Sequence, residues 1–196
     1  MQKKADPSNL YSTPFTEALR GFGLIHPDVK FGSNVTLGEG VIIEEGCKIG
    51  ANTFIGHYVV LRPRTIVGHN CMIGHLSVCE GDTVIGDRTT IHDQSHITSH
   101  AIFEEDIFIG PSFCCINTQH IKHGRDIILT LKGPLIRRAA RIGARVFVMP
   151  GLEIGKNAQI GAGSVVTKDV PDRECWFGNP AYFKKMVPDE ELLGET

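Results

Sequence analysis

The feature that most constrains this chain is a six-residue period in its large apolar side chains. From Ile25 to Cys115 every sixth residue is Ile, Leu, Val, Phe or Cys, and twelve of these sixteen are Ile, Leu or Val. The spacing resumes at Ile136 and continues to Val166. A period of six is neither the 3.6 of a helix nor the 2 of a simple strand. The pattern therefore predicts a chain that runs a short strand, turns and repeats.

Three such sides, one hexad each, would close a triangular coil. The large apolar residue of each hexad would point inward, and the small or β-branched residue four positions later would precede a corner. Stacked coils would pair as parallel strands about 4.8 Å apart. The sequence thus predicts an all-β parallel β-helix of about seven coils. Eight of the inward residues are followed by a glycine, which we expect to supply backbone dihedrals that a side chain resists: Gly32, Gly38, Gly50, Gly56, Gly68, Gly74, Gly86 and Gly110.

The repeat divides the chain into three parts. Residues 1–24 form a predicted capping segment with a short helix over residues 12–23, and residues 25–171 form the β-helix. The step of 21 from Cys115 to Ile136 is not a multiple of six, so an inserted loop over 116–135 leaves the coil and returns. Residues 172–196 predict a crossing segment and then a short polar helix near 189–193. Caps at both ends would hide the open edges of a solenoid.

Composition narrows the functional class. A formal net charge of −2 argues against a nucleic-acid partner. No apolar run reaches the length of a membrane span, and the first residues lack the apolar stretch of a secretory signal. The six cysteines include no Cys-x-x-Cys pair and sit mostly where small apolar residues are expected. We therefore expect free thiols, no membrane partner and a cytoplasmic location.

The outward strand positions favour an oligomer. Leu24, Ile42, Val60 and Val78 fall three hexads apart on one predicted face. A second face carries Ile66, Val84 and Ile102 at the same spacing. Apolar stripes of this kind are unusual on a monomer.

Several motifs carry a family resemblance. Residues 154–171 read IGKNAQIGAGSVVTKDVP, and residues 178–181 read GNPA. With the hexad period, these stretches resemble the hexapeptide-repeat acyltransferase superfamily. Residues 104–112 and 135–144 look like its nucleotide-sugar N-acetyltransferases. Residues 116–120 look like its maltose and galactoside O-acetyltransferases, which carry a catalytic histidine in that loop.

The resemblance implies a left-handed coil, a homotrimer and acetyl-CoA bound between neighbouring subunits. It also implies transfer of an acetyl group from acetyl-CoA to an amino or hydroxyl group of a sugar, with a nucleotide-linked amino sugar as the expected acceptor. The chain departs from both branches: the nucleotide-sugar branch generally lacks a loop histidine, and the other branch usually has proline where Ile121 stands. The acceptor atom, nitrogen or oxygen, is therefore left open.

The site residues follow from the chemistry of acetyl transfer. A neutral imidazole suits the removal of a proton from the nucleophile, and we assign that role to His120 in the inserted loop. His96 and His123 are alternative bases, and we expect both to contact substrate together with Asn117 and Glu105. Small residues would let the pantetheine arm approach and lysines would meet its phosphates; the predicted coenzyme residues are Gly143, Ala144, Gly161, Ala162, Lys168, Lys184 and Lys185.

Two other functions fit the same fold. A metal-dependent hydratase resembling the γ-class carbonic anhydrases would need two histidines five residues apart and a third two coils earlier. The close pairs here are six or four apart, as in His69–His75 and His92–His96, so we expect no metal site. A non-catalytic β-helix scaffold is the other alternative, although the long histidine-bearing loop argues against it.

Overall fold

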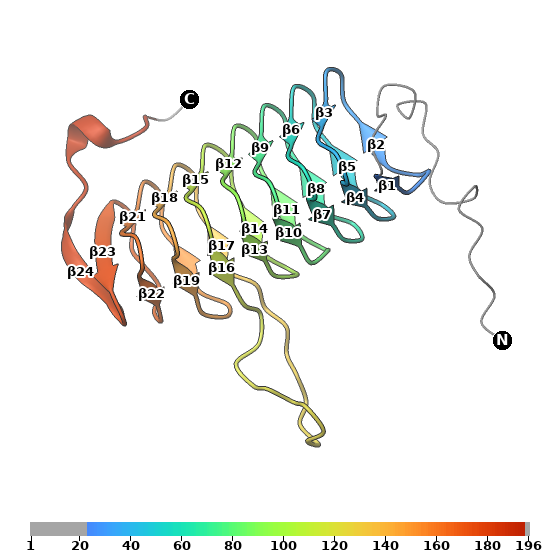
Figure 1. Cartoon of the computed structure of the whole chain (residues 1–196). Coiled ribbons are helices and arrows are strands. Elements are labelled where there is room, and N and C mark those ends of the chain that lie inside the picture. The colour runs from blue at the N-terminus through green and yellow to red at the C-terminus, as the bar shows by residue number, and fades with distance from the viewer. Residues whose placement is uncertain (1–22, 195–196) are drawn as a thin grey trace.

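The computed structural model describes residues 23–194 and confirms the all-β parallel β-helix (Figure 1). Three faces, A, B and C, meet at corners in the order A, B, C along each coil. Strands three hexads apart pair in parallel, as Leu24 does with Ile42. The chain leaves the coil once, between Cys115 and Leu135.

The strands of the three faces are two residues long except for the last two. Face A comprises β1 (Leu24–Ile25), β4 (Ile42–Ile43), β7 (Val60–Leu61), β10 (Val78–Cys79), β13 (His96–Ile97), β16 (Cys114–Cys115), β19 (Phe147–Val148) and β22 (Val165–Val166). Face B comprises β2 (Lys30–Phe31), β5 (Lys48–Ile49), β8 (Ile66–Val67), β11 (Val84–Ile85), β14 (Ile102–Phe103), β17 (Leu135–Ile136) and β20 (Glu153–Ile154). Face C comprises β3 (Thr36–Leu37), β6 (Phe54–Ile55), β9 (Met72–Ile73), β12 (Thr90–Ile91), β15 (Phe108–Ile109), β18 (Arg141–Ile142), β21 (Gln159–Ile160), β23 (Glu174–Gly178) and β24 (Ala181–Met186).

The described residues form eight coils, one more than the approximate count from sequence. The eighth has β22 on face A, an isolated bridge between Val170 and Ile154 on face B, and β23 on face C. The sequence missed this coil because its spacing departs from six after Val166. The predicted crossing segment over 176–180 is instead part of a hairpin, in which β24 pairs antiparallel with β23.

The two ends compare differently with the sequence predictions. The short C-terminal helix is a single 3-10 turn, η3 (Asp189–Glu191). The predicted N-terminal helix over 12–23 lies almost wholly outside the described residues.

The core follows the hexad rule. The second residue of each two-residue strand points inward, and Ile55, Leu61 and Ile73 are fully buried. The small residues before the corners, such as Thr53, Ser77 and Thr89, are buried as well. The first residue of each strand points outward, so the predicted apolar stripes exist: Ile66, Val84 and Ile102 are register neighbours and remain exposed.

The glycines after the inward residues have a different role from the one predicted. None of the eight has a positive φ. A Cβ built on Gly74 would lie 2.4 Å from the backbone nitrogen of Asp93, and one on Gly56 would lie 2.7 Å from that of His75. These glycines are therefore required by the close approach of successive coils. The left-handed conformation falls two residues later and is adopted by varied residues, such as Asn52, Tyr58 and Arg64.

Histidines connect successive coils at the corner between faces C and A. The backbone N–H of Glu39 donates to Nδ1 of His57, and that of His57 donates to Nδ1 of His75, both at 2.8 Å. The N–H of His75 donates in turn to Asp93 Oδ1 at 2.8 Å. The His57 and His75 rings stack with centroids 4.9 Å apart. These contacts give His57 and His75 a structural role, because each one joins its coil to the coil before it.

Replacing Gly74 with alanine should destabilise the coil by about 1–3 kcal/mol, because the new methyl group overlaps the backbone of the next coil. Gly163 provides a matched control, since it has a φ of +72° and no atom within 4 Å of its would-be Cβ. Gly163→Asn should change the free energy of unfolding by less than about 0.5 kcal/mol, because asparagine tolerates this conformation. Chemical denaturation compares the two, and equal losses would contradict the close-approach argument.

Removing the acceptor at His75 should destabilise the histidine ladder. His75→Ala leaves the backbone N–H of His57 without its side-chain acceptor and should lower the free energy of unfolding by about 0.5–1.5 kcal/mol. His75→Asp keeps an acceptor, as Asp93 does one coil later, and should lose less. His123→Asn, in the inserted loop, should leave the free energy of unfolding unchanged. Chemical denaturation makes the comparison, and a loss in His75→Asp as large as that in His75→Ala would contradict the role of the acceptor.

Candidate functional site

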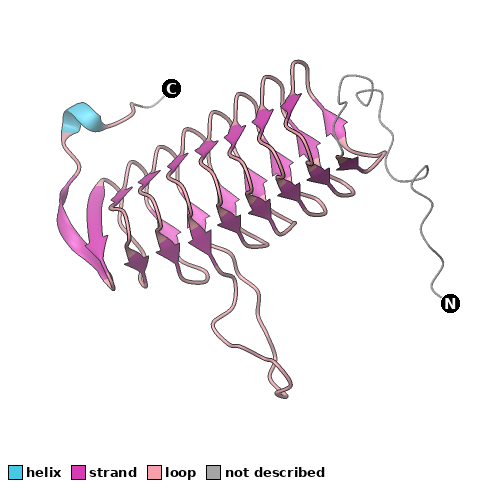
Figure 2. Cartoon of the chain, in the orientation of Figure 1, coloured by secondary structure: helices cyan, strands magenta, loops and turns pink. Residues whose placement is uncertain are grey.

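The inserted loop, residues 116–134, projects from the corner between faces A and B (Figures 1 and 2). Its base is held by two contacts. The Lys132 N–H donates to the carbonyl of Asn117 at 2.7 Å, which ties the two ends of the loop together. The side-chain amide of Asn117 donates to Ser99 Oγ at 2.7 Å, on the same corner one coil earlier. Asn117 is thus half-buried and fixed by the coil.

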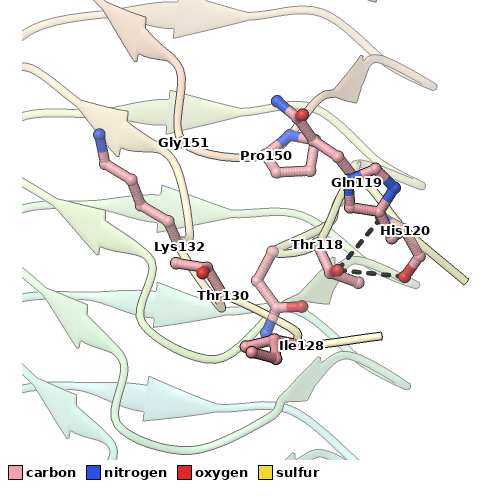
Figure 3. Close-up of a pocket in the computed structure, with 9 residues that line it drawn as sticks. Thr118, Gln119, His120, Ile128, Thr130, Lys132, Pro150 and Gly151 are labelled. Atoms are coloured by element: carbon pink, nitrogen blue, oxygen red, sulfur yellow. Dashed lines mark hydrogen bonds between the residues drawn. The ribbon is translucent and has the colours of Figure 1, made fainter. Parts of the chain in front are cut away.

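A groove of about 450 Å³ lies between the loop and the next coil. It is lined by Asn117, Thr118, Gln119, His120, Ile128, Thr130, Lys132, Pro150 and Gly151. Thr118 fixes the backbone of His120, because its hydroxyl accepts from the His120 N–H at 3.3 Å and donates to the His120 carbonyl at 3.1 Å. Within residues 23–194 the His120 ring has no hydrogen-bonding partner. Figure 3 shows this ring at the edge of the groove.

The groove is polar and contains one cation. Lys132 lies across it from His120 (Figure 3), and no acidic side chain is among its lining residues. Gly151, at a φ of +68°, makes room for the lysine stem, since a Cβ there would lie 2.9 Å from Lys132 Cδ. Lys132, Pro150 and Gly151 were not predicted from sequence. The hexad register could have found the last two, because it places residues 149–152 on the corner from which the loop leaves.

The other predicted acceptor residues do not line the groove. His96 faces outward from β13, and its Nε2 lies 3.4 Å from Glu80 Oε1. His123 lies further along the loop, and its carbonyl accepts from Arg125. Glu105 lies at the corner between faces B and C, 3.5 Å from Arg138 Nε. Of the predicted acceptor residues, the groove brings together Asn117 and His120.

The acidic run 104–106 is engaged in ion pairs with arginines. Asp106 accepts from Arg88 Nε at 2.6 Å and from Arg138 Nε at 3.0 Å. The hydrogen bond from Arg88 is the main reason that the pKa of Asp106 lies below its usual value. Glu104 accepts from Arg137 at 2.9 Å. These contacts give the run a structural function at its corner.

A second, shallower pocket of about 280 Å³ lies on face C. Three of the predicted coenzyme residues, Gly143, Gly161 and Ala162, line it. Ala144 lies beside them at the corner between faces C and A, where its carbonyl accepts from the Gly163 N–H at 2.8 Å. The remaining lining residues, which the sequence analysis did not select, are Phe108, Arg141, Ile142, Gln159, Ile160 and Phe177.

The predicted lysines lie at two separate places on the coil. Lys184 and Lys185 lie on β24, at the edge of face C, and are exposed. The Lys184 ammonium sits 3.7 Å from the centroid of the Tyr182 ring. Lys168 follows β22 and lies at the corner between faces A and B. The structure therefore places two of the three lysines on the same sheet as the glycine-lined pocket.

Outside these two cavities, the described residues offer few reactive groups. Burial raises the pKa of the Cys115 thiol to about 12. Among residues 23–194 no three His, Cys, Asp or Glu side chains are grouped to hold a metal ion. In the same part of the chain, no helix has the length and apolarity to cross a bilayer.

Comparison with known proteins supports this description. The family model for the GMPPB C-terminal domain matches residues 20–107, and that for the bacterial transferase hexapeptide, six repeats, matches residues 133–168. The crystal structure of the polySia-specific acetyltransferase NeuO has a TM-score of 0.57 at 23% identity, covering 86% of each chain. That likeness shows the shared fold.

Two curated relatives match over short stretches. The galactoside O-acetyltransferase of Lactococcus lactis subsp. lactis is 52% identical over 51 residues, 26% of this chain and 25% of the relative. The dTDP-3-amino-3,6-dideoxy-alpha-D-galactopyranose 3-N-acetyltransferase of Aneurinibacillus thermoaerophilus is 45% identical over 53 residues, 27% of this chain and 28% of the relative. The matches thus span about a quarter of these relatives' lengths. In its repeats, its fold and these matches, the chain is similar to the hexapeptide-repeat transferases.

Proposed function

We propose that this protein transfers an acetyl group from acetyl-CoA to an amino or hydroxyl group of a sugar, with a nucleotide-linked amino sugar as the expected acceptor. The observation that carries the proposal is the groove beside the inserted loop, in which His120 borders a polar cavity at a fixed backbone position. The two curated relatives, named as a galactoside O-acetyltransferase and an amino-sugar N-acetyltransferase, support this class of acceptor.

His120 would act as the general base. The acceptor oxygen or nitrogen attacks the thioester carbonyl carbon, and its proton passes to the neutral imidazole of His120. The tetrahedral intermediate then expels the coenzyme thiolate, which takes up the proton that His120 holds. Asn117 and Lys132, at the base of the loop, are placed to bind polar groups of the acceptor.

The coenzyme would bind along face C. Gly143, Gly161 and Ala162 present little side-chain bulk there, so a pantetheine arm can lie against the backbone. Phe108 and Phe177 provide apolar walls, and Lys184 and Lys185 lie on the same sheet. Lys168, at another corner, would reach this coenzyme only from a neighbouring subunit. Six free cysteines agree with a reducing cytoplasm.

The separation of the two cavities supports an active site that is shared between subunits. The acceptor groove lies at the corner between faces A and B, whereas the coenzyme pocket lies on face C, and they share no lining residue. A homotrimer would place the loop of one subunit beside face C of the next. The exposed apolar stripe formed by Ile66, Val84 and Ile102 supports such an interface.

His120→Ala should lower kcat by about 10²–10⁴-fold, the usual contribution of a general base. The affinity for acetyl-CoA should change little, because the proposed coenzyme contacts lie on face C. Steady-state kinetics tests this by comparing the kcat of His120→Ala with those of His123→Ala and His96→Ala. A wild-type kcat in the His120 variant with a large loss in either of the others would reassign the base.

Co-expression of two inactive variants tests the shared site. His120→Ala removes the base, and Ala162→Trp fills the coenzyme pocket at an exposed residue. In mixed trimers about a quarter of the interfaces would pair an intact loop with an intact pocket, so about a quarter of wild-type activity should return. A site contained within one subunit would give no recovery, and a monomer by light scattering would contradict the trimer directly.

A further inference from the structure

The C-terminal tail lies against the pocket proposed for the coenzyme. After β24 the chain forms η3, whose three residues Asp189, Glu190 and Glu191 are all acidic and none of which is buried. Figure 1 shows this turn returning from the hairpin along the coil. The tail is held mainly by polar contacts: Leu193 exchanges hydrogen bonds with Asn157 at 2.8 and 3.2 Å, and the carbonyl of Gly194 accepts from Arg138 at 2.9 Å.

A further contact of the tail reaches the pocket itself. Arg141 is the outward residue of β18 and lines the pocket beside Gly143 and Gly161. Its Nη2 lies 2.8 Å from Glu191 Oε2. The same Nη2 is shielded from solvent and makes no hydrogen bond of good geometry. The carboxylate therefore neutralises the guanidinium without satisfying the N–H groups of Nη2.

A guanidinium with free donors on the wall of a pocket is suited to a phosphate, which accepts two parallel hydrogen bonds from arginine. Coenzyme A carries phosphate groups. A carboxylate can bind an arginine in the same way as a phosphate, but less strongly. We propose that Arg141 binds a phosphate of the coenzyme and that Glu191 is a built-in competitor, which occupies Arg141 until the coenzyme displaces it. This inference rests on the proposed function.

The strength of the ion pair agrees with displacement. The side chains of Arg141 and Glu191 are 35% and 41% exposed, and ion pairs of that exposure are weak. A phosphate of the coenzyme carries more charge than a carboxylate. It would therefore displace Glu191 from Arg141 at ordinary coenzyme concentrations. The tail would then remain attached through Asn157 and through the ion pair between Arg173 and Asp189.

The neighbouring glutamate supplies a matched control. Glu190 is in the same turn and exposed, but within the described part of the chain it makes no ion pair. Neutralising Glu190 changes the net charge of the tail as much as neutralising Glu191 does. Any difference between Glu190→Gln and Glu191→Gln therefore reports on the contact with Arg141.

The experiment measures binding of coenzyme A and of pantetheine, which lacks the phosphates, to the full-length protein by titration calorimetry. Glu191→Gln should lower the Kd for coenzyme A about two- to fivefold, the value of one exposed ion pair. Glu190→Gln should leave it unchanged. Arg141→Gln should raise the Kd for coenzyme A about tenfold or more, because a charge-assisted contact is lost. Pantetheine affinity should be the same in all four proteins.

Three results would overturn the inference. One is an unchanged or weaker affinity of Glu191→Gln for coenzyme A with a lowered melting temperature, which would make the ion pair a structural brace. Another is an equal gain in Glu190→Gln, which would make the effect one of net charge. The third is an unchanged affinity in Arg141→Gln. If the wild-type protein binds no coenzyme A, the proposed function fails as well, whereas coenzyme binding that is indifferent to Arg141 and Glu191 overturns this inference alone.

Discussion

The fold depends on how closely one coil stacks on the next. Every strand from β1 to β22 is only two residues long, so a coil is held to its neighbours by a few backbone hydrogen bonds per face and by the side chains that fill the interior. At that separation a Cβ after many of the inward residues would overlap the next backbone, as at Gly74. The same separation lets His57, His75 and Asp93 accept hydrogen bonds from the coil before. Packing, corner composition and the histidine ladder all follow from this distance.

The regular part of the fold could be predicted from sequence because it is periodic. The inward positions, the small buried residues before the corners and the outward apolar stripes all repeat with the hexad or with the coil, and the structure places them as the period requires. The structural role of the glycines that follow the inward residues could not be derived in this way. Period alone does not separate a residue that must bend the backbone from one that must leave room for another strand. The stacking of the coils shows that Gly56 and Gly74 are of the second kind.

The end of the coil and the site were harder to predict for a related reason. The eighth coil is irregular in its spacing, so β23 and β24 resembled a crossing segment. Among the residues that line the groove, sequence selected Asn117 and His120 of the loop, because an insertion into a strict repeat stands out. It missed Lys132, Arg141, Phe108 and Phe177, which occupy ordinary positions and line cavities only through neighbours elsewhere in the chain. Glu105 was selected for its charge, but Arg138 already engages that charge.

Stacking of this kind also makes the molecule modular along its axis. The loop leaves from the coil that contains β16, and the pocket on face C is lined by Phe108 of β15 and by the coils that follow it, so every proposed coenzyme and groove residue lies C-terminal to Ser99. Of the first four coils, only the last contacts the coil that contains β15. They act as a spacer whose length is set in whole coils of three hexads each. Removal or duplication of one such unit would shift the N-terminal end along the axis and leave the groove and the pocket with the same neighbours, so the distance between this end of the protein and its chemistry can change independently of the chemistry.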